Sequence, residues 1–332
     1  MLGKAAVNGK GAILLGRCVA CDSFDDARPL RVVTHAHYDH LTGLQQSLRK
    51  CKAVIMTAAT KDLLEAMRGR WSLTRDNVKT LAYEEPLIYE DEKLTLYFAD
   101  HILGTAQVLV EDAEGRRILY TSDFRLPKTP IINTNVLVIE ATYGNPMQVR
   151  PFKKLVKNAL VSLVERGLKQ GPVYIFGYHG KLQEVMQILH NARVKTPFVV
   201  PEKVFRLSKI CEKHGMKLGR YLLFSEDEAQ SMLKKKDSYT ALYHMNSRRY
   251  IGKDAFRIFV SGWEFSSPRR QIGDNEHIIA LSDHSDFKGL LQYVEESKPK
   301  LVITDNYRMG AAKTLAKQIE KRLKIPAKPL PK

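Results

Sequence analysis

The sequence predicts an α/β protein in two parts. Short apolar runs rich in β-branched residues repeatedly give way to polar residues, as buried strands do where they open into loops. From about residue 147, strand-like and helix-like segments alternate, which indicates a further α/β layer. A length of 332 residues favours two domains, or one large domain that carries an insertion. We therefore expect a core formed by residues 1–146 and 256–332, and an inserted domain at 147–255.

The elements of the first part follow from the spacing of apolar residues. Apolar alternation or a short apolar run predicts a strand, and apolar residues three and four apart predict a helix. The expected strands are Leu30–Val33, Ala53–Met56, Lys93–Ala99, Gln107–Glu111, Arg117–Tyr120 and Val136–Ile139. The expected helices are Leu44–Lys50 and Thr60–Arg68. Residues 112–115 have the composition of a hairpin turn, so the strands on either side of them should pair.

The same spacing predicts the elements that follow residue 147. The expected strands are Pro172–Phe176, Tyr239–Tyr243, Phe256–Val260, His277–Leu281 and Leu301–Thr304. The expected helices are Phe152–Arg166, a helix that ends at Leu189, Val204–His214, Glu226–Lys236, Lys288–Ser297 and Gly310–Lys324. The tail at 325–332 carries three prolines, which exclude a helix there.

A cluster of histidines directly after the first expected strand indicates a metal site. Three of the ten histidines of the chain, and one aspartate, lie within six residues at 35–40. Residues two apart share a face of an extended segment, so His35 and His37 can hold one ion together. Asp39 and His40, past the bend, could reach a second ion. Imidazole suits zinc. The alternative is a polar loop that happens to be rich in histidine, and the clustering argues against it.

Four more residues with metal-binding or acid–base side chains stand at strand ends or before a helix. His101 ends one strand and could complete a site with the first histidines. Asp123 could bridge two ions, since one carboxylate offers two oxygens. Glu140 stands at the end of the next strand, and His284 lies in a loop that opens a helix. Strand ends can gather such side chains around one point at the edge of a sheet.

Charge points to a polyanionic partner. The chain has 53 Lys and Arg against 36 Asp and Glu, a net charge of +17, which is common among nucleic-acid-binding proteins. A basic surface kept for solubility is the alternative. The pairs Arg248-Arg249 and Arg269-Arg270 could follow a phosphate backbone, although exposed arginine pairs are commonly just solvated. Together with a metal cluster, the charge favours a phosphodiester substrate.

Cysteine usage and the terminus suggest a cytoplasmic location. The four cysteines make a poor disulfide framework in a chain of this size, and we expect core or incidental thiols. No apolar run approaches the roughly 20 residues that span a bilayer, so no membrane partner is expected. The N-terminus lacks the apolar region and cleavage site of a signal peptide.

These motifs, in this order, resemble those of the metallo-β-lactamase superfamily. The HxHxDH segment at 35–40, His101 and Asp123 are shared by many of its hydrolases. Two further motifs narrow the resemblance to the β-CASP nucleases: residues 140–144 resemble their motif A, and residues 282–286 resemble their motif B. Ser261-Gly262-Trp263 also resembles a segment of ligase-associated exonucleases and their archaeal relatives. The resemblance implies a four-layer αββα sandwich with an inserted α/β β-CASP domain.

The resemblance also implies roles for the candidate residues. One zinc ion would be held by His35, His37, His101 and Asp123, and another by Asp39, His40 and Asp123. Asp39, Glu140 and His284 would be catalytic, with Glu140 orienting the His40 side and His284 protonating the leaving oxygen. The alternative is that His284 is itself a zinc ligand. Two ions ~3.5–4 Å apart can clamp the attacking and leaving oxygens of a phosphodiester.

One departure from the family pattern leaves open whether the site binds a second zinc ion. RNA-processing members carry a further metal-site histidine, motif C, on the last sheet strand, and here Ile303 occupies that position. The DNA-repair branch similarly has an apolar residue there. Asp305 could supply an oxygen ligand instead. The cofactor is thus expected to be one or two zinc ions.

The expected function is a zinc-dependent nuclease acting on single-stranded DNA or RNA. The missing motif C histidine favours the DNA-repair type, and an RNA-processing nuclease is the alternative. A hydrolase of small substrates is disfavoured by the inserted domain and the charge of +17. A silent nucleic-acid-binding subunit is disfavoured by the complete set of candidate residues. Protein partners are not predicted.

Overall fold

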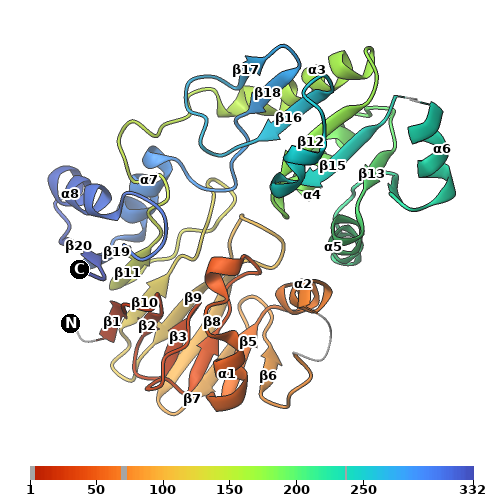
Figure 1. The fold of residues 1–332 in the computed structure, drawn as a ribbon. Coiled ribbons are helices and arrows are strands. Elements are labelled where there is room, and N and C mark those ends of the chain that lie inside the picture. The colour runs from red at the N-terminus through yellow and green to blue at the C-terminus, as the bar shows by residue number, and fades with distance from the viewer. Residues whose placement is uncertain (1–3, 69–72, 236–237) are drawn as a thin grey trace. The chain divides into compact units, whose positions relative to one another are not determined.

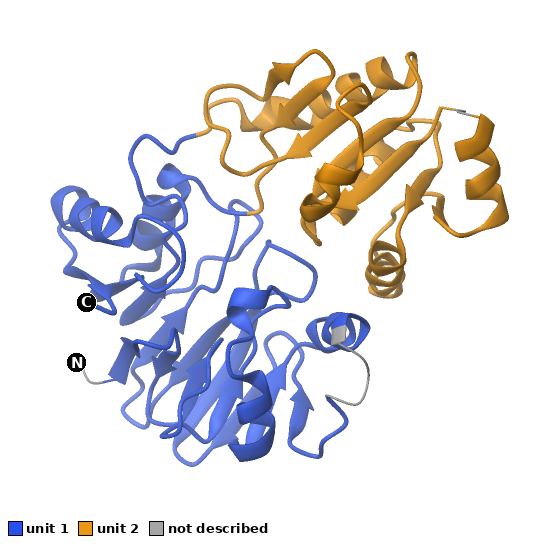
Figure 2. Cartoon of the chain, viewed as in Figure 1, with its two compact units in different colours: residues 1–149, 284–332 blue, residues 150–283 orange. Residues whose placement is uncertain are grey.

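The protein divides into two compact units, shown here in a computed structural model (Figure 1). The structure describes residues 4–68, 73–235 and 238–332. Unit 1 comprises residues 1–149 and 284–332, and unit 2 comprises residues 150–283 (Figure 2). Both ends of the chain therefore belong to unit 1, and unit 2 is an insertion in it.

The second boundary of the insertion differs from the expected one. The first boundary lies within a few residues of the expected position, but residues 256–283 belong to unit 2 and not to the core. The reason is strand pairing: β16 (Phe256–Val260), β17 (Arg269–Gly273) and β18 (Glu276–Ile279) join the sheet of unit 2. Such pairing joins segments far apart in sequence, and local periodicity does not reveal it.

Unit 1 is built on two sheets. The first has the order β1-β2-β3-β4-β5-β6 and the second the order β20-β19-β11-β10-β9-β8-β7. The strands of the first sheet are β1 (Ala5–Val7), β2 (Ile13–Leu15), β3 (Val19–Cys21), β4 (Leu30–Val32), β5 (Ala53–Met56) and β6 (Val78–Thr80). Those of the second are β7 (Pro86–Tyr89), β8 (Glu92–Phe98), β9 (Ala106–Glu111), β10 (Arg117–Tyr120), β11 (Val136–Ile139), β19 (Leu301–Asp305) and β20 (Ala327–Leu330).

Helices cover the outer faces of both sheets (Figure 1). They are α1 (Leu44–Lys50), α2 (Ala58–Arg68), α7 (Phe287–Ser297) and α8 (Ala312–Leu323). Inward side chains of the two sheets, such as Ile55 and Val108, form one buried cluster between them. Alternate residues of the second sheet, such as Leu119, pack instead with Leu290 of α7 and Leu315 of α8. The expected four-layer α/β sandwich is therefore confirmed.

The proline-rich tail forms a strand. It was expected only to be non-helical, and β20 adds to the sheet in parallel with β19, with Ala327 opposite Val302. Proline is tolerated at this place because β20 is an edge strand. The tail thereby closes one end of the second sheet.

Unit 2 is an α/β layer around a seven-stranded sheet of order β14-β13-β15-β12-β16-β18-β17. Its other elements are η4 (Lys153–Leu155), α3 (Val156–Leu168), β12 (Val173–Gly177), α4 (Lys181–Asn191), β13 (Phe198–Val200), α5 (Glu202–Lys213), β14 (Tyr221–Leu223), α6 (Asp227–Lys235), β15 (Thr240–His244) and η5 (Met245–Tyr250). All described pairs are parallel except β17 with β18. Lys236, expected to end α6, lies outside the described residues.

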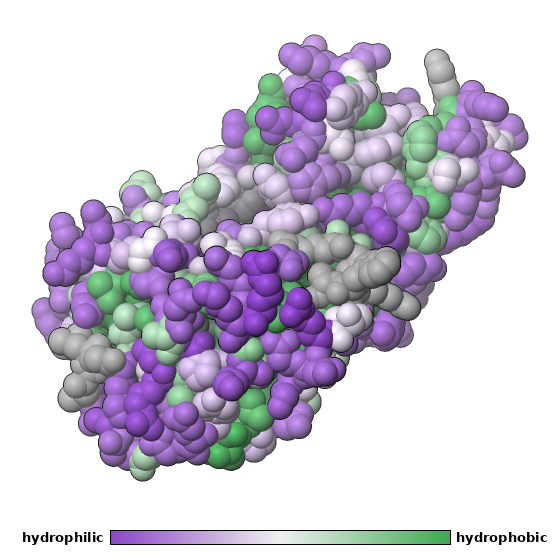
Figure 3. Space-filling model, turned by 60° about the horizontal axis from the view of Figure 1, so that its bottom comes forward, coloured by the Kyte–Doolittle hydropathy of each residue, from purple (hydrophilic) through white to green (hydrophobic). Residues whose placement is uncertain are grey.

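The face of the protein in Figure 3 is mostly polar, and the cysteines are buried. Hydrophilic residues predominate on the face in Figure 3, and apolar residues form small scattered groups there. Among the described residues, every helix is too short or too polar to cross a lipid bilayer. All four cysteines are buried and unbonded, as expected for core thiols.

Candidate metal centre

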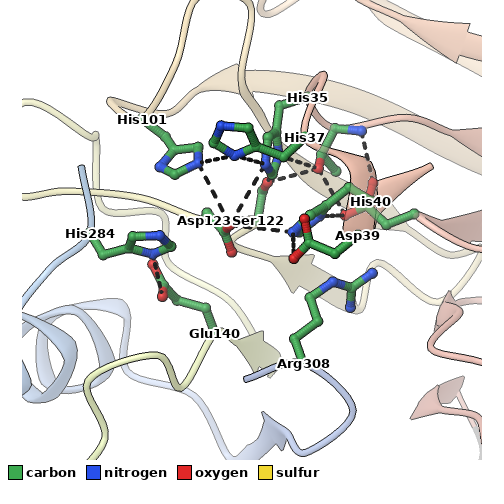
Figure 4. A network of polar contacts seen from close by, with 12 residues as sticks. His35, His37, Asp39, His40, His101, Ser122, Asp123, Glu140, His284 and Arg308 are labelled. Atoms are coloured by element: carbon green, nitrogen blue, oxygen red, sulfur yellow. Dashed lines mark hydrogen bonds and ion pairs between the residues drawn. The ribbon is translucent and has the colours of Figure 1, made fainter. Parts of the chain in front are cut away.

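The predicted site residues gather at one edge of unit 1, in loops contributed by both sheets (Figure 4). Their places are as follows: His35, His37, Asp39 and His40 follow β4, His101 follows β8, Asp123 follows β10, Glu140 follows β11, and His284 precedes α7. The strands β8 and β10 run in the same direction, because each is antiparallel to β9 between them. Their carboxyl ends therefore meet at the same edge.

Four of these side chains form a tight group: His35, His37, His101 and Asp123, whose candidate ligand atoms all lie within 4.8 Å of one another. The Nδ1 of His37 lies 3.2 Å from Nε2 of His35 and 3.0 Å from Nε2 of His101. The Oδ2 of Asp123 lies 3.6 Å from Nε2 of His35 and 3.7 Å from Nε2 of His101. Tetrahedral zinc, with ligands at about 2.0–2.2 Å, holds neighbouring ligand atoms about 3.3–3.6 Å apart. The spacing of the group fits such an ion.

The protonation states of the group also suit a metal. Burial, with the neighbouring His40 and His101, holds the pKa of His35 well below its usual value, so its imidazole is neutral. Burial acts to raise the pKa of Asp123, but His40 and His284 outweigh it, and the pKa lies well below the usual value. Neutral imidazole and ionised carboxylate are the forms that bind a divalent cation.

The donor set therefore fits a divalent metal ion. Three ring nitrogens face one another, and each pair of nitrogens can share only one proton between them. Without a cation at their centre, nitrogen lone pairs would meet in a buried place. Three nitrogens and one carboxylate oxygen are the usual donors of a zinc site that keeps room for water or substrate.

A chain of hydroxyl groups orients His35 from behind. The hydroxyl of Ser122 donates to Thr34 Oγ1 at 2.8 Å, and the hydroxyl of Thr34 donates to Asp22 Oδ2 at 2.8 Å. The Nδ1 of His35 lies 3.1 Å from Thr34 Oγ1 and can donate its proton to that oxygen. This arrangement leaves Nε2 of His35 as the nitrogen with a lone pair, on the side of the metal group.

Asp22 also orients His40. Its Oδ2 lies 2.7 Å from Nδ1 of His40, and both side chains are fully buried. Asp22 and Ser122 adopt left-handed backbone conformations, with φ of 60° and 54°. Such a conformation costs a residue other than glycine about 1–3 kcal/mol, and it persists where the surroundings compensate. Both strained residues of this edge thus support candidate ligands.

The second predicted group consists of Asp39, His40 and Asp123. The Nε2 of His40 lies 3.5 Å from Asp39 Oδ2 and 3.3 Å from Asp123 Oδ2. Burial and Arg308 act to lower the pKa of His40, but Asp123, Asp22 and Asp39 outweigh them and raise it to about 10. In the metal-free protein, His40 is therefore a protonated imidazolium that lies among the carboxylates of Asp22, Asp39 and Asp123.

Glu140 contacts a different histidine from the one expected. Its Oε2 lies 2.9 Å from Nδ1 of His284, and its Oε1 accepts from the backbone N–H of Phe124 at 2.9 Å. The expectation that Glu140 orients the His40 side is wrong, and Asp22 holds that ring instead. The ring of His284 lies beside the ring of His101, with centroids 4.7 Å apart. Glu140 thus fixes a histidine at the margin of the metal group.

Strand β19 of the second sheet brings Asp305, not Ile303, to the edge. Ile303 is fully buried between the sheets, so a side chain at this position points into the core. Asp305, two residues on and on the same face of β19, ends the strand. Its carboxylate is already engaged: Oδ1 accepts from the N–H of Tyr307 at 2.9 Å, and Oδ2 contacts Arg308 Nη1 at 2.7 Å.

Several functional candidates escaped the sequence analysis: Asp22, Thr34, Ser122 and Arg308. Asp22 follows the pattern of a polar residue after a strand, but β3 has only three residues, too few for a clear strand signal in the sequence. Ser122 stands beside Asp123, and a serine at a strand end carries no signature of a role at a metal site. A cation such as Arg308 is not part of any metal-binding pattern, so only the structure could reveal it.

The chain is similar to several known proteins. The family model described as the metallo-beta-lactamase superfamily matches residues 32–175. An uncharacterized protein in the lig 3′ region of Acidianus ambivalens is 39% identical over 138 residues, which are 41% of this chain and 99% of that protein. An RNase J-like protein of Methanocaldococcus jannaschii is 32% identical over 193 residues, 50% of this chain and 44% of that protein.

Two further similarities extend over most of the chain. A probable DNA ligase of Opitutus terrae is 27% identical over 285 residues, 82% of this chain and 26% of that protein. A crystal structure of a protein of unknown function from Enterococcus faecalis V583 superposes with a TM-score of 0.58 at 15% identity. The superposition covers 85% of this chain and 76% of the Enterococcus faecalis chain, and it shows that the two proteins share a fold. The chain spans less than half the length of the RNase J-like protein and of the probable DNA ligase.

The sandwich and its histidine-rich edge define a protein of the metallo-β-lactamase type, a fold that binds metal ions. The chain belongs to the metallo-β-lactamase superfamily and, within it, to the β-CASP nuclease family.

Asp22→Asn should weaken metal binding. The amide keeps an acceptor for Thr34 but presents N–H groups to a histidine that needs a carboxylate, and groups that orient metal ligands typically contribute about 10–100-fold in affinity or activity. We expect a rise of that size in the dissociation constant for zinc, measured by competition with a chelator. The control is Asp26→Asn, an exposed carboxylate that pairs with Lys50. Equal affinities of the two variants would contradict the orienting role of Asp22.

Proposed function

We propose that the chain is a zinc-dependent nuclease that hydrolyses phosphodiester bonds of single-stranded nucleic acid. The observation that carries the proposal is the group of three imidazoles and one carboxylate, with the His284–Glu140 pair at its margin. Zinc is the favoured ion, because it prefers nitrogen donors in a tetrahedral arrangement. When bound, it would supply Lewis acidity, which makes water nucleophilic near neutral pH.

The chain's own residues would handle the protons and the orientation. His35, His37, His101 and Asp123 would hold the ion. Asp39, whose side chain is 64% exposed, can accept a hydrogen bond from the attacking water at the open side. His284 would give its proton to the leaving oxygen, and Glu140 would fix the ring and stabilise the imidazolium.

A basic pocket in unit 2 supports a polyanionic substrate. It has a volume of about 680 Å³, within the range of ligand sites, and Arg248, Arg249, Lys253 and Arg257 contribute cations to its lining. Arg257 is paired with Glu276 at 2.6 Å. Among the described residues, the side chains of Arg248 and Lys253 have no acidic partner. Unpaired cations beside apolar wall residues such as Phe259 suit a phosphate backbone and its bases.

The favoured function is a nuclease of the DNA-repair type, with DNA as its substrate, and RNA is the second candidate substrate. DNA is supported by the probable DNA ligase, whose similarity covers 82% of this chain. RNA is supported by the RNase J-like protein, which is more similar, at 32% identity, over a shorter stretch. A hydrolase of small substrates is disfavoured because unit 2 carries a basic pocket. A catalytically silent nucleic-acid-binding subunit is disfavoured because the group of four candidate metal ligands is complete.

The deciding assay uses end-labelled single-stranded DNA and RNA of the same sequence, with zinc-loaded protein and product mapping. We expect cleavage of DNA and none by Asp123→Asn, which removes one ligand charge at nearly constant size. Faster cleavage of RNA than of DNA would replace the DNA proposal by the RNA one. Cleavage of neither polymer by a zinc-loaded wild-type chain would refute the nuclease proposal.

His284→Ala should slow turnover of an oligonucleotide by roughly 10²–10⁴-fold, the usual contribution of a positioned proton donor. A nitrophenyl phosphodiester has a leaving group that needs less protonation, so its hydrolysis should fall less. Zinc content should stay constant in this variant. The control is His190→Ala, which changes an exposed histidine of unit 2. Loss of zinc with equal damage to both substrates would make His284 a ligand instead.

Replacing Arg248 and Arg249 together by alanine should weaken binding of single-stranded DNA. Two lost phosphate contacts should reduce the log–log salt slope by about 1.4, at about 0.7 per contact. The matched control is Lys317→Ala with Lys321→Ala, which removes the same charge from an exposed face of α8. Titrations of the catalytically inactive Asp123→Asn protein at several salt concentrations measure the slope. Equal slopes in the two double variants would rule out this pocket as a contact site.

A further inference from the structure

The structure holds a permanent cation beside the second predicted ligand group. Arg308 lies in the loop after β19, and its side chain is only 9% exposed. In Figure 4 it extends from that loop toward Asp39 and His40. Its Nη1 contacts Asp305 Oδ2 at 2.7 Å, and its Nη2 donates to the carbonyl of Gly11 at 3.3 Å.

The loop that carries Arg308 is closely packed on both sides. A side chain at Gly11 would collide with the ring of Tyr307, whose nearest atom would lie 2.3 Å from the added Cβ. A side chain at Gly310 would collide with the carbonyl oxygen of Ala141 at 2.2 Å. Glycine at these two positions allows the loop to approach β11 and the N-terminal strands. The guanidinium is therefore held in place and does not swing in solvent.

The charge of Arg308 acts on the second ligand group. Burial acts to lower the pKa of Arg308, but Tyr120, Asp305 and Asp22 outweigh it, so the guanidinium stays charged. Burial acts to raise the pKa of Asp22, the carboxylate that orients His40, but His40 and, to a smaller extent, Arg308 outweigh it and lower the pKa. A second divalent ion at Asp39, His40 and Asp123 would meet this fixed positive charge. It would also lack the carboxylate of Asp305, which Arg308 already occupies.

We propose that Arg308 takes the place of a second metal ion, so that the chain works with one ion. The inference rests on the proposed metal centre and deepens it. Arg308 is a positioning residue: it supplies countercharge to Asp22 and Asp305 where a second ion would otherwise stand. Arginine suits this task because its guanidinium does not lose its proton in proteins. The ion held by His35, His37, His101 and Asp123 is then the only one that binds tightly.

The test is metal stoichiometry, which is independent of activity. The 332-residue chain is stripped with a chelator, reloaded with excess zinc, desalted and weighed by native mass spectrometry. We expect one zinc per chain in the wild type and in Arg308→Lys, which keeps the charge. We expect two in Arg308→Met, because the charge is gone and Asp305 becomes available as a ligand. Thermal unfolding shows whether each variant is folded.

The outcomes separate this inference from the proposed function. Two tightly bound ions in the wild type would overturn the role of Arg308 and leave the metal centre intact. One ion in a folded Arg308→Met would also overturn it and leave a purely structural ion pair with Asp305. If the wild type binds no zinc, both the proposed metal centre and the proposed role of Arg308 are refuted. If Arg308→Met does not fold, Arg308→Gln, which also removes the positive charge and keeps a polar side chain in the loop, carries the same expectation of two ions.

Discussion

An ionised carboxylate buried away from water must be paired with a positive charge, and the metal site of this protein depends on two such carboxylates. Asp22 and Asp123 lie at the edge of the sandwich, where burial alone would favour their neutral form. His40 lies between them, 2.7 Å from one and 3.3 Å from the other, and keeps both ionised. An ionised Asp123 beside neutral imidazoles creates the metal group. An ionised Asp22 orients the rings behind it.

The need for countercharge explains why the site draws on so much of unit 1. The histidine-rich loop comes from the first sheet, whereas Asp123 and His101 come from the second. Neither sheet alone contains a complete set of ligands. The site therefore forms only when the two sheets pack against each other, and the buried cluster between them is a condition for the chemistry.

The part of the site that could be predicted from sequence is the part with local signatures. His35 and His37 stand two residues apart after an apolar run, and that spacing is visible in one short segment. His101 and Asp123 were found because each follows an expected strand, and strand ends meet at an edge. The αββα layering came from the order of these motifs, through their resemblance to a known family.

The rest depended on contacts between distant segments. Asp22 reaches His40 across 18 residues, and Glu140 reaches His284 across 144. Nothing in the spacing of Glu140 could say which histidine it contacts, and the expected choice was wrong. The end of unit 2 was misplaced for the same reason, because residues 256–260 form a strand whose partner, β12, precedes them by some eighty residues. No local pattern in the sequence marks Arg308, and its place near the second ligand group follows only from the structure, where its side chain is buried.

Anomalous diffraction at the zinc absorption edge, from crystals of the zinc-loaded chain, tests the central claim most directly. We expect one strong peak, bounded by Nε2 of His35, Nδ1 of His37, Nε2 of His101 and Oδ2 of Asp123. We expect no peak of comparable height between Asp39 and His40. A strongest peak away from the four ligands, or no peak at all in zinc-loaded crystals, would contradict the account.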